Sequence, residues 1–223
     1  NDYEILSKNL SEFADYLTIN ISSPNTPNLR DFHQTNNLKK VLISVKNGIA
    51  KSKSLDLQLP IFLKIAPDIS KNDLKQIIET ANENNISGLI ISNTTVDRNK
   101  ELQSDNLHET GGLSGIPLFN KSTNFLALAS KIIKIKKYNL YLIAAGGVSD
   151  SKSAYAKILC GAHLVQLYSS MTFDGPLIAE NILKGLLQLM NRDKISSIKD
   201  IRGIVDNPED AMKIANNGLK DYL

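Results

Sequence analysis

Short apolar runs alternate along this chain with longer segments in which apolar residues recur every three or four positions. Five runs have the composition of β-strands, at residues 17–22, 61–66, 88–93, 141–146 and 164–169. They are apolar almost throughout, which is typical of strands covered on both faces, and each ends in polar or glycine residues. Strands that alternate with helices predict a parallel sheet with crossover helices.

The segments between the strands carry helix patterns. One apolar face is formed by Leu38, Val41, Leu42, Val45 and Ile49. Ser70 and Asp73 have capping-box spacing before a periodic run, which predicts a helix start. Further periodic patterns lie at residues 125–133 and 182–190, and the basic run at 131–137 suits the end of a helix, where cations meet the negative end of the dipole.

The order of strands and helices permits an open doubly wound sheet or a closed barrel. An open sheet would bind its ligand at one switch point, whereas here every strand ends in a polar cluster, as expected when all strand ends face one central mouth. We therefore predict a TIM-type (β/α)8 barrel. Such a barrel needs eight strands, so we expect about three before Asn1. No low-complexity linker divides residues 1–223, which are expected to belong to a single domain.

Composition and charge exclude several classes of function. The net charge of +3 comes from 26 basic and 23 acidic residues that are interspersed, so a nucleic-acid partner is not expected. Cys160 is the lone cysteine, which excludes an internal disulfide, and its apolar surroundings predict a buried, inert thiol. No apolar stretch approaches the roughly 20 residues that cross a bilayer.

The first strand leads into a polar loop that could hold a ligand. Alternation places Asn20 and Ser22 on one face, and the loop at residues 23–30 contains two prolines. A plain polar turn is the simpler interpretation, because Ser, Pro and Asn dominate loops. However, Asn20 lies in an apolar strand and needs hydrogen-bond partners there, and the prolines stiffen the loop. These features favour a preorganised site.

Lys64 stands in the middle of an apolar strand. A structural ion pair, or a side chain that extends to solvent at the barrel mouth, would explain it. Alternatively, a lysine directed at the mouth could stabilise negative charge on a cofactor. Residues 92–95 (Ser-Asn-Thr-Thr) and the glycine-rich segment 109–115 follow the third strand and would, taken alone, be ordinary loops.

The ends of the last two predicted strands favour a phosphate site. Residues 144–149 end one strand and open a helix, and residues 166–170 end the next, so that backbone N–H groups should converge. Tight packing of small residues is the alternative. His33, His108 and His163 show no ligand spacing, so we interpret them as unrelated loop or surface residues and predict no metal site.

Several of these segments, in this order, resemble the signature of the dihydroorotate dehydrogenase family. They are Asn20-Ile21-Ser22-Ser23-Pro24-Asn25-Thr26, Lys64-Ile65-Ala66-Pro67-Asp68, Ser92-Asn93-Thr94-Thr95, Glu109-Thr110-Gly111-Gly112-Leu113-Ser114-Gly115 and Gln166-Leu167-Tyr168-Ser169. The resemblance runs from about residue 14 to about residue 185, and several ordered motifs are far more specific than one.

The resemblance implies an FMN enzyme that oxidises dihydroorotate to orotate in pyrimidine biosynthesis. On the family's pattern, Ser23 matches the catalytic base that takes the C5 proton while hydride leaves C6 for the flavin. The residues that match the substrate contacts are Asn20, Asn25, Asn93 and Thr94. Those that match the FMN contacts are Asn20, Lys64, Ser92, Gly115, Gly147, Tyr168 and Ser169, of which the last three surround the phosphate.

A serine at the base position resembles class 2 of the family, which implies a quinone as electron acceptor. It also implies peripheral contact with the bacterial cytoplasmic membrane, or with the mitochondrial inner membrane, through an N-terminal helical element expected before Asn1. A serine hydroxyl is a poor base, so a proton relay is expected. The rival interpretations are a related FMN barrel acting on another pyrimidine or on uridine in RNA, and a non-catalytic phosphate-binding barrel fragment.

Overall fold

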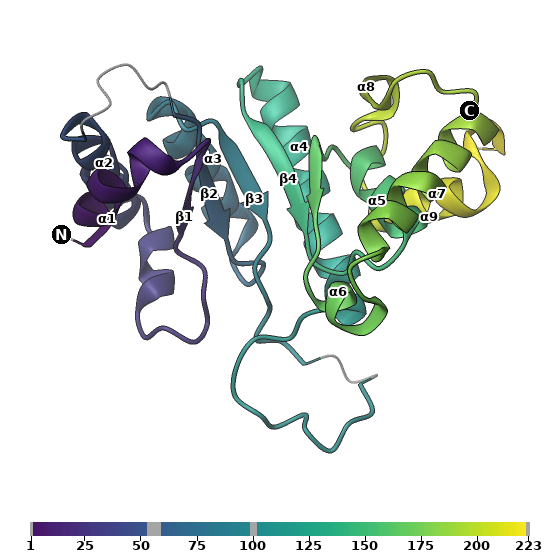
Figure 1. The fold of residues 1–223 in the computed structure, drawn as a ribbon, viewed down its shortest axis with the longest axis horizontal. Coiled ribbons are helices and arrows are strands. Elements are labelled where there is room, and N and C mark those ends of the chain that lie inside the picture. The colour runs from purple at the N-terminus through teal and green to yellow at the C-terminus, as the bar shows by residue number, and fades with distance from the viewer. Residues whose placement is uncertain (1, 53–58, 99–101, 222–223) are drawn as a thin grey trace.

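The structure, a computed structural model, describes residues 2–52, 59–98 and 102–221. Figure 1 shows five strands in one sheet with helices packed around it. The strands are β1 (Leu17–Asn20), β2 (Ile61–Ile65), β3 (Gly88–Ile91), β4 (Tyr141–Ala145) and β5 (Leu164–Gln166). All five predicted strands are confirmed, although each ends one to three residues earlier than predicted, because the terminal polar residues turn away into loops.

The helices include all those predicted from periodicity. They are α1 (Asp2–Leu10), α2 (Thr35–Ala50), α3 (Lys71–Glu83), α4 (Phe119–Lys136), α5 (Ser151–Leu159), α6 (Ser169–Asp174), α7 (Ile178–Arg192), α8 (Ile198–Ile201) and α9 (Pro208–Asn217). Single 3-10 turns lie at Ser11–Phe13, Leu29–His33, Ile116–Leu118 and Leu219–Asp221. Within the described ranges, every helix is too short or too polar to cross a bilayer.

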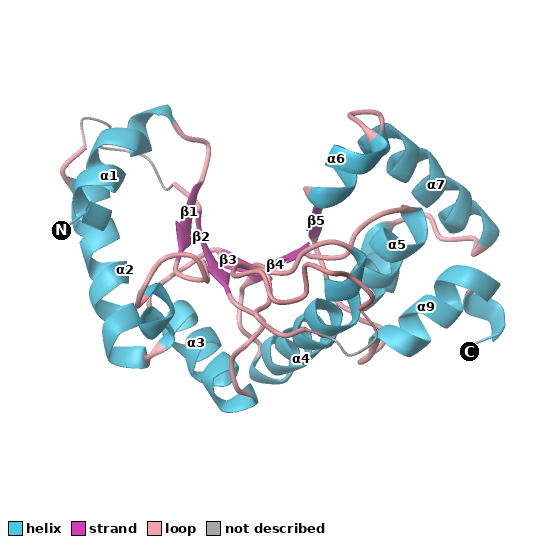
Figure 2. Cartoon of the chain, turned by 90° about the horizontal axis from the view of Figure 1, so that it is seen from below, coloured by secondary structure: helices cyan, strands magenta, loops and turns pink. Residues whose placement is uncertain are grey.

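The strands are parallel and follow one another in sequence order, β1-β2-β3-β4-β5. In register, Asn20 lies beside Lys64 and Lys64 beside Ile90. A doubly wound sheet would reverse its order at a switch point, whereas sequential order is that of a (β/α)8 barrel. Figure 2 shows the five strands as a curved band with α2, α3, α4 and α5 on its outer side. The α/β barrel-type architecture is therefore confirmed, as an open arc.

The two faces of the arc differ in how much apolar surface they bury. Outward side chains such as Leu63, Leu89 and Leu142 join the helices in one large core. The inner face holds a small cluster of Ile90, Ile143 and Ala145, against which Phe62 packs. Burying an aliphatic side chain contributes about 1.5–3 kcal/mol, so the outer layer contributes most to the stability of the arc.

Local signals in the sequence correspond to real helix boundaries. Ser70 Oγ accepts a hydrogen bond from Asp73 N at 3.1 Å, and the Asp73 carboxylate accepts from Ser70 N at 3.3 Å, which confirms the capping box. The basic run ends α4, where Lys137 adopts the left-handed conformation with φ of 55°. Cys160 is fully buried, and burial raises the pKa of its thiol to about 12, which makes the reactive thiolate hard to form.

Candidate functional site

The carboxyl ends of the strands border a cavity of about 630 Å³. Its lining includes every residue predicted to contact FMN except Asn20: Lys64, Ser92, Gly115, Gly147, Tyr168 and Ser169. Asn20 lies beside Lys64 in the β1–β2 register, at the edge of the same region. Parallel order explains this gathering, because it brings the carboxyl ends of all strands to one edge.

Three side chains at the ends of β1 and β3 form a hydrogen-bonded set. Ser22 Oγ donates to Asn20 Oδ1 at 2.8 Å, and Asn93 Nδ2 donates to Ser22 Oγ at 3.0 Å. Asn93 Oδ1 in turn accepts from Thr94 N at 2.8 Å. Ser22 is fully buried whereas Asn20 is exposed. The serine therefore orients the two side-chain amides from the protein interior, and their solvent-facing atoms remain available to a ligand.

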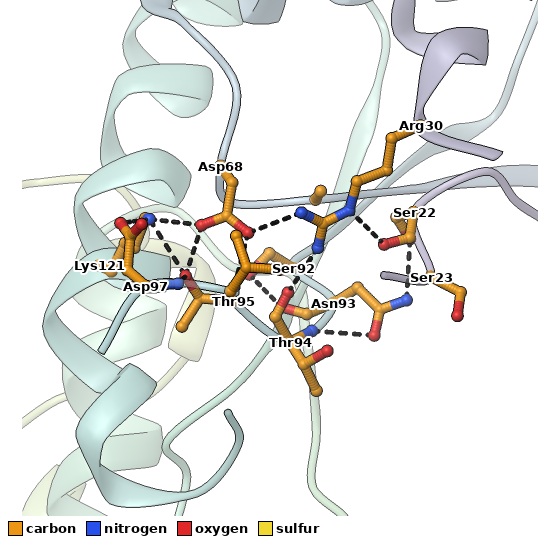
Figure 3. A network of polar contacts seen from close by, with 12 residues as sticks. Ser22, Ser23, Arg30, Asp68, Ser92, Asn93, Thr94, Thr95, Asp97 and Lys121 are labelled. Atoms are coloured by element: carbon orange, nitrogen blue, oxygen red, sulfur yellow. Dashed lines mark hydrogen bonds and ion pairs between the residues drawn. The ribbon is translucent and has the colours of Figure 1, made fainter. Parts of the chain in front are cut away.

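Ser23 follows this set directly and is half-buried. In the described part of the chain its hydroxyl makes one hydrogen bond, which it accepts from Asn25 N at 3.2 Å. Its side chain points away from Asn93 in Figure 3. A proton relay to a stronger base is not among the contacts of the described residues.

The glycine-rich loop packs against the polar loops at the ends of β1 and β3. A Cβ on Gly112 would lie 1.8 Å from Thr94 Oγ1, and one on Gly111 would lie 3.5 Å from Asn25 Oδ1. An isolated antiparallel bridge between Thr95 and Leu113 fixes the loop beside the end of β3. Gly112 is thus required for close approach, and the loop lies beside two predicted substrate contacts, Thr94 and the exposed Asn25.

An ionic network ties together the ends of β1, β2 and β3 (Figure 3). The guanidinium of Arg30 donates to Ser22 O at 3.2 Å, to Asp68 Oδ2 at 2.9 Å and to Thr94 O at 3.2 Å. Lys121 of α4 pairs with the other oxygen of Asp68 and also with Asp97. A planar guanidinium presents its donors in a rigid fork, so Arg30 holds three loops in one geometry.

Asp68 is the centre of that network, and its side chain is only 10% exposed. Burial by itself would raise its pKa, but hydrogen bonds from Lys121, Thr95 and Val96 N, with the charge of Lys121, outweigh burial and hold the pKa below its ordinary value. Asp68 is therefore a fixed carboxylate that keeps Arg30 and Lys121 in place.

Lys64 is half-buried and reaches the cavity from β2. Burial lowers the pKa of its ammonium, and no charged neighbour contributes to that shift. Among the described residues it takes part in no ion pair, unlike the structural ion pair considered from the sequence. An unpaired cation at a cavity wall can stabilise negative charge on a ligand.

Two glycine turns form the side of the cavity next to β4 and β5. Gly146 and Gly147 have φ of 98° and 78°, and a Cβ on Gly147 would lie 2.4 Å from Phe119 Cα. Gly115 has φ of 75°, and Ser169 Oγ donates to Ser114 Oγ at 2.8 Å across the opening. Positive φ favours glycine at all three positions, and close packing adds to this demand at Gly146 and Gly147.

The three histidines lie in separate parts of the fold, and His33 belongs to the segment between β1 and α2. His33 is buried, with Nδ1 2.7 Å from Arg30 O and Nε2 accepting from Ala66 N at 3.2 Å. Burial lowers its pKa, which keeps the ring neutral. His163 Nδ1 accepts from Leu142 N at 3.1 Å, and His108 is exposed. In the described ranges, no group of three or more His, Cys, Asp or Glu could hold a metal ion.

Sequence reasoning missed the residues that position the site: Ser22 as an orienting group, Arg30, Asp68 and Lys121. Arg30 and Asp68 carried one usable signal, because each is a charged residue a few positions beyond an apolar strand. Lys121 carried none, since it reaches Asp68 from a helix that follows a long loop.

Comparison with known proteins places these features in a family. The sequence pattern of the family described as dihydroorotate dehydrogenase matches residues 1–190. The curated "Dihydroorotate dehydrogenase (quinone)" of Bartonella tribocorum is 42% identical over 203 residues, which are 91% of this chain and 56% of that protein. The protein of the same name from Rhizobium johnstonii is 41% identical over 206 residues, covering 90% and 55%.

Solved structures agree. The crystal structure of ligand-free DHODH from Eimeria tenella is similar with a TM-score of 0.83 and 32% identity, over 92% of this chain and 60% of that one. The complex of the same DHODH with ferulenol gives the same TM-score over 91% and 57%. The chain spans about half the length of the curated relatives it matches.

Proposed function

The chain belongs to the dihydroorotate dehydrogenase family, and we propose on that basis that it takes part in the FMN-dependent oxidation of dihydroorotate to orotate in UMP biosynthesis. The observation that carries the proposal is the gathering of the predicted FMN contacts around one cavity at the strand ends. We also propose that residues 1–223 belong to a single catalytic barrel.

The residues present fit an FMN. The cavity of about 630 Å³ is lined on one side by Lys64, which has no ion-pair partner among the described residues, and on the other by the two glycine turns. Ser169, at the first position of α6, also lines it. Backbone N–H groups of Gly147, Tyr168 and Ser169 suit a phosphate, and Ser92 and Gly115 suit the neighbouring polar atoms. When bound, FMN supplies the acceptor for the substrate's hydride.

Substrate would be held by the amides and hydroxyl at the ends of β1 and β3. Asn20 and Asn93 are oriented by buried Ser22, and Asn25 and Thr94 lie under the glycine-rich loop. Neutral amides can both donate and accept, as a pyrimidine ring with alternating N–H and C=O groups requires. This arrangement supports a polar, cyclic substrate bound beside the cavity.

Ser23 is proposed as the base that removes the C5 proton. Substitution Ser23→Ala should slow anaerobic bleaching of bound flavin by dihydroorotate about 10²- to 10⁴-fold, the usual contribution of a general base. Ser87→Ala, before β3 at the opposite edge of the sheet, is the control and should bleach normally. Near-normal bleaching in Ser23→Ala would remove Ser23 from the mechanism, and a native protein that takes up no FMN would contradict the enzymatic function.

The electron acceptor is proposed to be a quinone, because the curated relatives carry that acceptor in their names. Peripheral association with a membrane, either the bacterial cytoplasmic or the mitochondrial inner membrane, accompanies this proposal. Stopped-flow reoxidation of the dihydroorotate-reduced protein tests it: a soluble ubiquinone analogue should reoxidise the flavin faster than fumarate or NAD. Equal rates with all three acceptors would contradict a specific quinone.

A further inference from the structure

Lys157 is a fully buried lysine in the last turn of α5. Its Nζ donates a hydrogen bond of 2.6 Å to Ser122 Oγ and lies 5.1 Å from the centre of the Phe119 ring. Buried lysines are rare unless they are paired, and no carboxylate pairs with Lys157 among the described residues. Burying a cation without an acidic partner costs free energy, and a negative charge on a nearby ligand would offset that cost.

Ser122 connects this ammonium to the glycine turn after β4. Ser122 Oγ lies 3.0 Å from Gly146 O and 3.1 Å from Phe119 O, as donor. A hydroxyl has a single hydrogen, and an ammonium can only donate. When Lys157 is charged, it therefore occupies an acceptor site of Ser122 and leaves the hydroxyl hydrogen for the two carbonyls.

Phe119 provides a second connection to the same turn. A Cβ on Gly147 would lie 2.4 Å from Phe119 Cα, so that Gly147 rests directly on this residue. The ring of Phe119 lies under the ammonium of Lys157, in a cation–π contact. Lys157 is thus connected to Gly146 through Ser122 and to Gly147 through Phe119. Both glycines line the cavity.

We propose that Lys157 is a positioning residue for the phosphate of the flavin: its buried charge orders the Gly146–Gly147 turn through Ser122 and Phe119 and attracts the phosphate dianion that the turn receives. The inference rests on the proposed function, because the phosphate is that of FMN. A charge in the protein interior is poorly screened, so it can act on an anion that it does not touch.

The charges around α5 leave Lys157 to this role. Among the described residues, Cys160 is the one titratable group that acts on the pKa of Lys157, and α4 contributes Ser122 and Phe119 to its surroundings. Tyr155 donates a hydrogen bond to Asp193, just after α7, and the charge of Arg192 acts on the same tyrosine. Asp206 and Glu209, from the segment before α9 and from α9 itself, act on Cys160. These acidic groups therefore act on Tyr155 and on Cys160, the residue that follows α5.

This arrangement makes phosphate binding depend on pH. Burial lowers the pKa of Lys157 to about 7, and a bound phosphate would raise it again. The lysine's contribution to affinity is therefore fully present below pH 7 and is lost as the pH rises through the higher pKa of the complex. The phosphate itself has its second pKa at about 6, so its charge is nearly constant above pH 7.

Comparison of FMN with riboflavin, which lacks the phosphate, tests the proposal. The flavin-free protein is titrated with each compound, and quenching of flavin fluorescence gives the two dissociation constants. Lys157→Met, which replaces the cation by an apolar chain of similar length, should weaken FMN about tenfold and leave riboflavin unchanged. Equal weakening of both, or of neither, would overturn the proposal.

Two further variants separate positioning from general stability. Tyr155→Phe, also buried on α5, removes a hydrogen bond to Asp193 and should lower the melting temperature without changing the ratio of the two constants. Ser122→Ala should weaken FMN by a smaller factor and again spare riboflavin. An unchanged FMN-to-riboflavin ratio in Ser122→Ala would contradict the route through Gly146.

The native protein provides a test that needs no substitution, should Lys157→Met fail to fold. Between pH 7 and pH 9 its affinity for FMN should fall while that for riboflavin stays level, and a constant ratio would overturn the proposal. If the native protein binds FMN and the ratio of its FMN to riboflavin affinity does not change with pH, only the role of Lys157 is refuted. One that binds neither flavin refutes the proposed function and this inference with it.

Discussion

The two ends of the site solve the problem of buried charge differently. At the ends of β1, β2 and β3, Asp68 lies between Arg30 and Lys121, so that each charge has a partner. Beside β4, Lys157 is buried with a hydroxyl and an aromatic ring but without an acidic group in the described chain. The ionic network at the first end is complete without a ligand, whereas Lys157 at the second end leaves a positive charge for a ligand to neutralise.

This difference corresponds to what each end is proposed to hold. The ring amide groups of the substrate are best oriented by rigid side-chain amides, and the ionic network holds those side chains in place with charges that balance one another. A phosphate carries about two charges and gains most from an unpaired cation and backbone donors. The following experiments test the contrast, beginning with the largest expected effect.

Removing the central carboxylate should be the most damaging change. Asp68→Ala leaves the partly buried Arg30 without a carboxylate and Lys121 with only the exposed Asp97, which should cost about 3–5 kcal/mol in the free energy of unfolding, measured with urea. Asp97 is the exposed partner of Lys121, and the Asp97 side chain is 70% exposed. Asp97→Ala should therefore cost less than about 1 kcal/mol in the free energy of unfolding. Equal losses in the two variants would show that the network does not depend on Asp68.

A methyl group on Gly147 should damage the other end through packing. Gly147→Ala strains a residue with φ of 78° and forces a contact with the backbone of Phe119. Gly175 has the same φ, but a Cβ on Gly175 would have nothing within 4 Å. Gly175→Ala therefore introduces the backbone strain without the close contact. The extra loss of unfolding free energy in Gly147→Ala should be about 1–3 kcal/mol, the usual cost of overpacking. Flavin-quenching titrations should also show weakened FMN binding in Gly147→Ala. Equal losses of unfolding free energy in Gly147→Ala and Gly175→Ala would contradict the close approach of Gly147 to Phe119.

Replacing the fork of Arg30 should separate substrate binding from cofactor binding. Arg30→Lys keeps the charge beside Asp68 but loses donors to Ser22 O and Thr94 O, at a cost of about 1–2 kcal/mol. Titration of the FMN-loaded protein should show weaker binding of orotate, with little change in FMN affinity. Lys39→Ala, in an exposed ion pair on α2, is the control and should alter neither. Weakened FMN binding with normal orotate binding would reverse the assignment of the two ends.

The smallest effect is a pH dependence of the first end. Because the folded-state pKa of Asp68 is held below its ordinary value of 3.8, its contribution is present above pH 3.8 and is lost as the pH falls through the folded pKa. The stability difference between native protein and Asp68→Ala should therefore narrow in urea titrations carried out below about pH 4. A difference that stays constant down to pH 2 would show that the network does not depend on this ionisation.

The strands and the helices could be read from the sequence because their signals are local. Apolar runs, helical periodicity, the Ser70 capping box and the polar ends of the strands depend only on neighbouring residues. Parallel order then brings the strand ends together, which explains why Lys64, Ser92 and Gly147 line one cavity. Their assignment as FMN contacts came from family resemblance and stays a prediction, as does the role of Ser23.

The sequence by itself therefore determined the type and order of the elements and the edge at which they carry polar groups. Only the tertiary structure decided which charges are paired. Arg30, Asp68 and Lys121 are brought together from three separate elements, and Lys157 looks like an ordinary lysine of a surface helix until the packing of α4 on α5 buries it. The physical reason is that burial and electrostatic pairing depend on distances between residues far apart in the chain, to which local patterns do not respond.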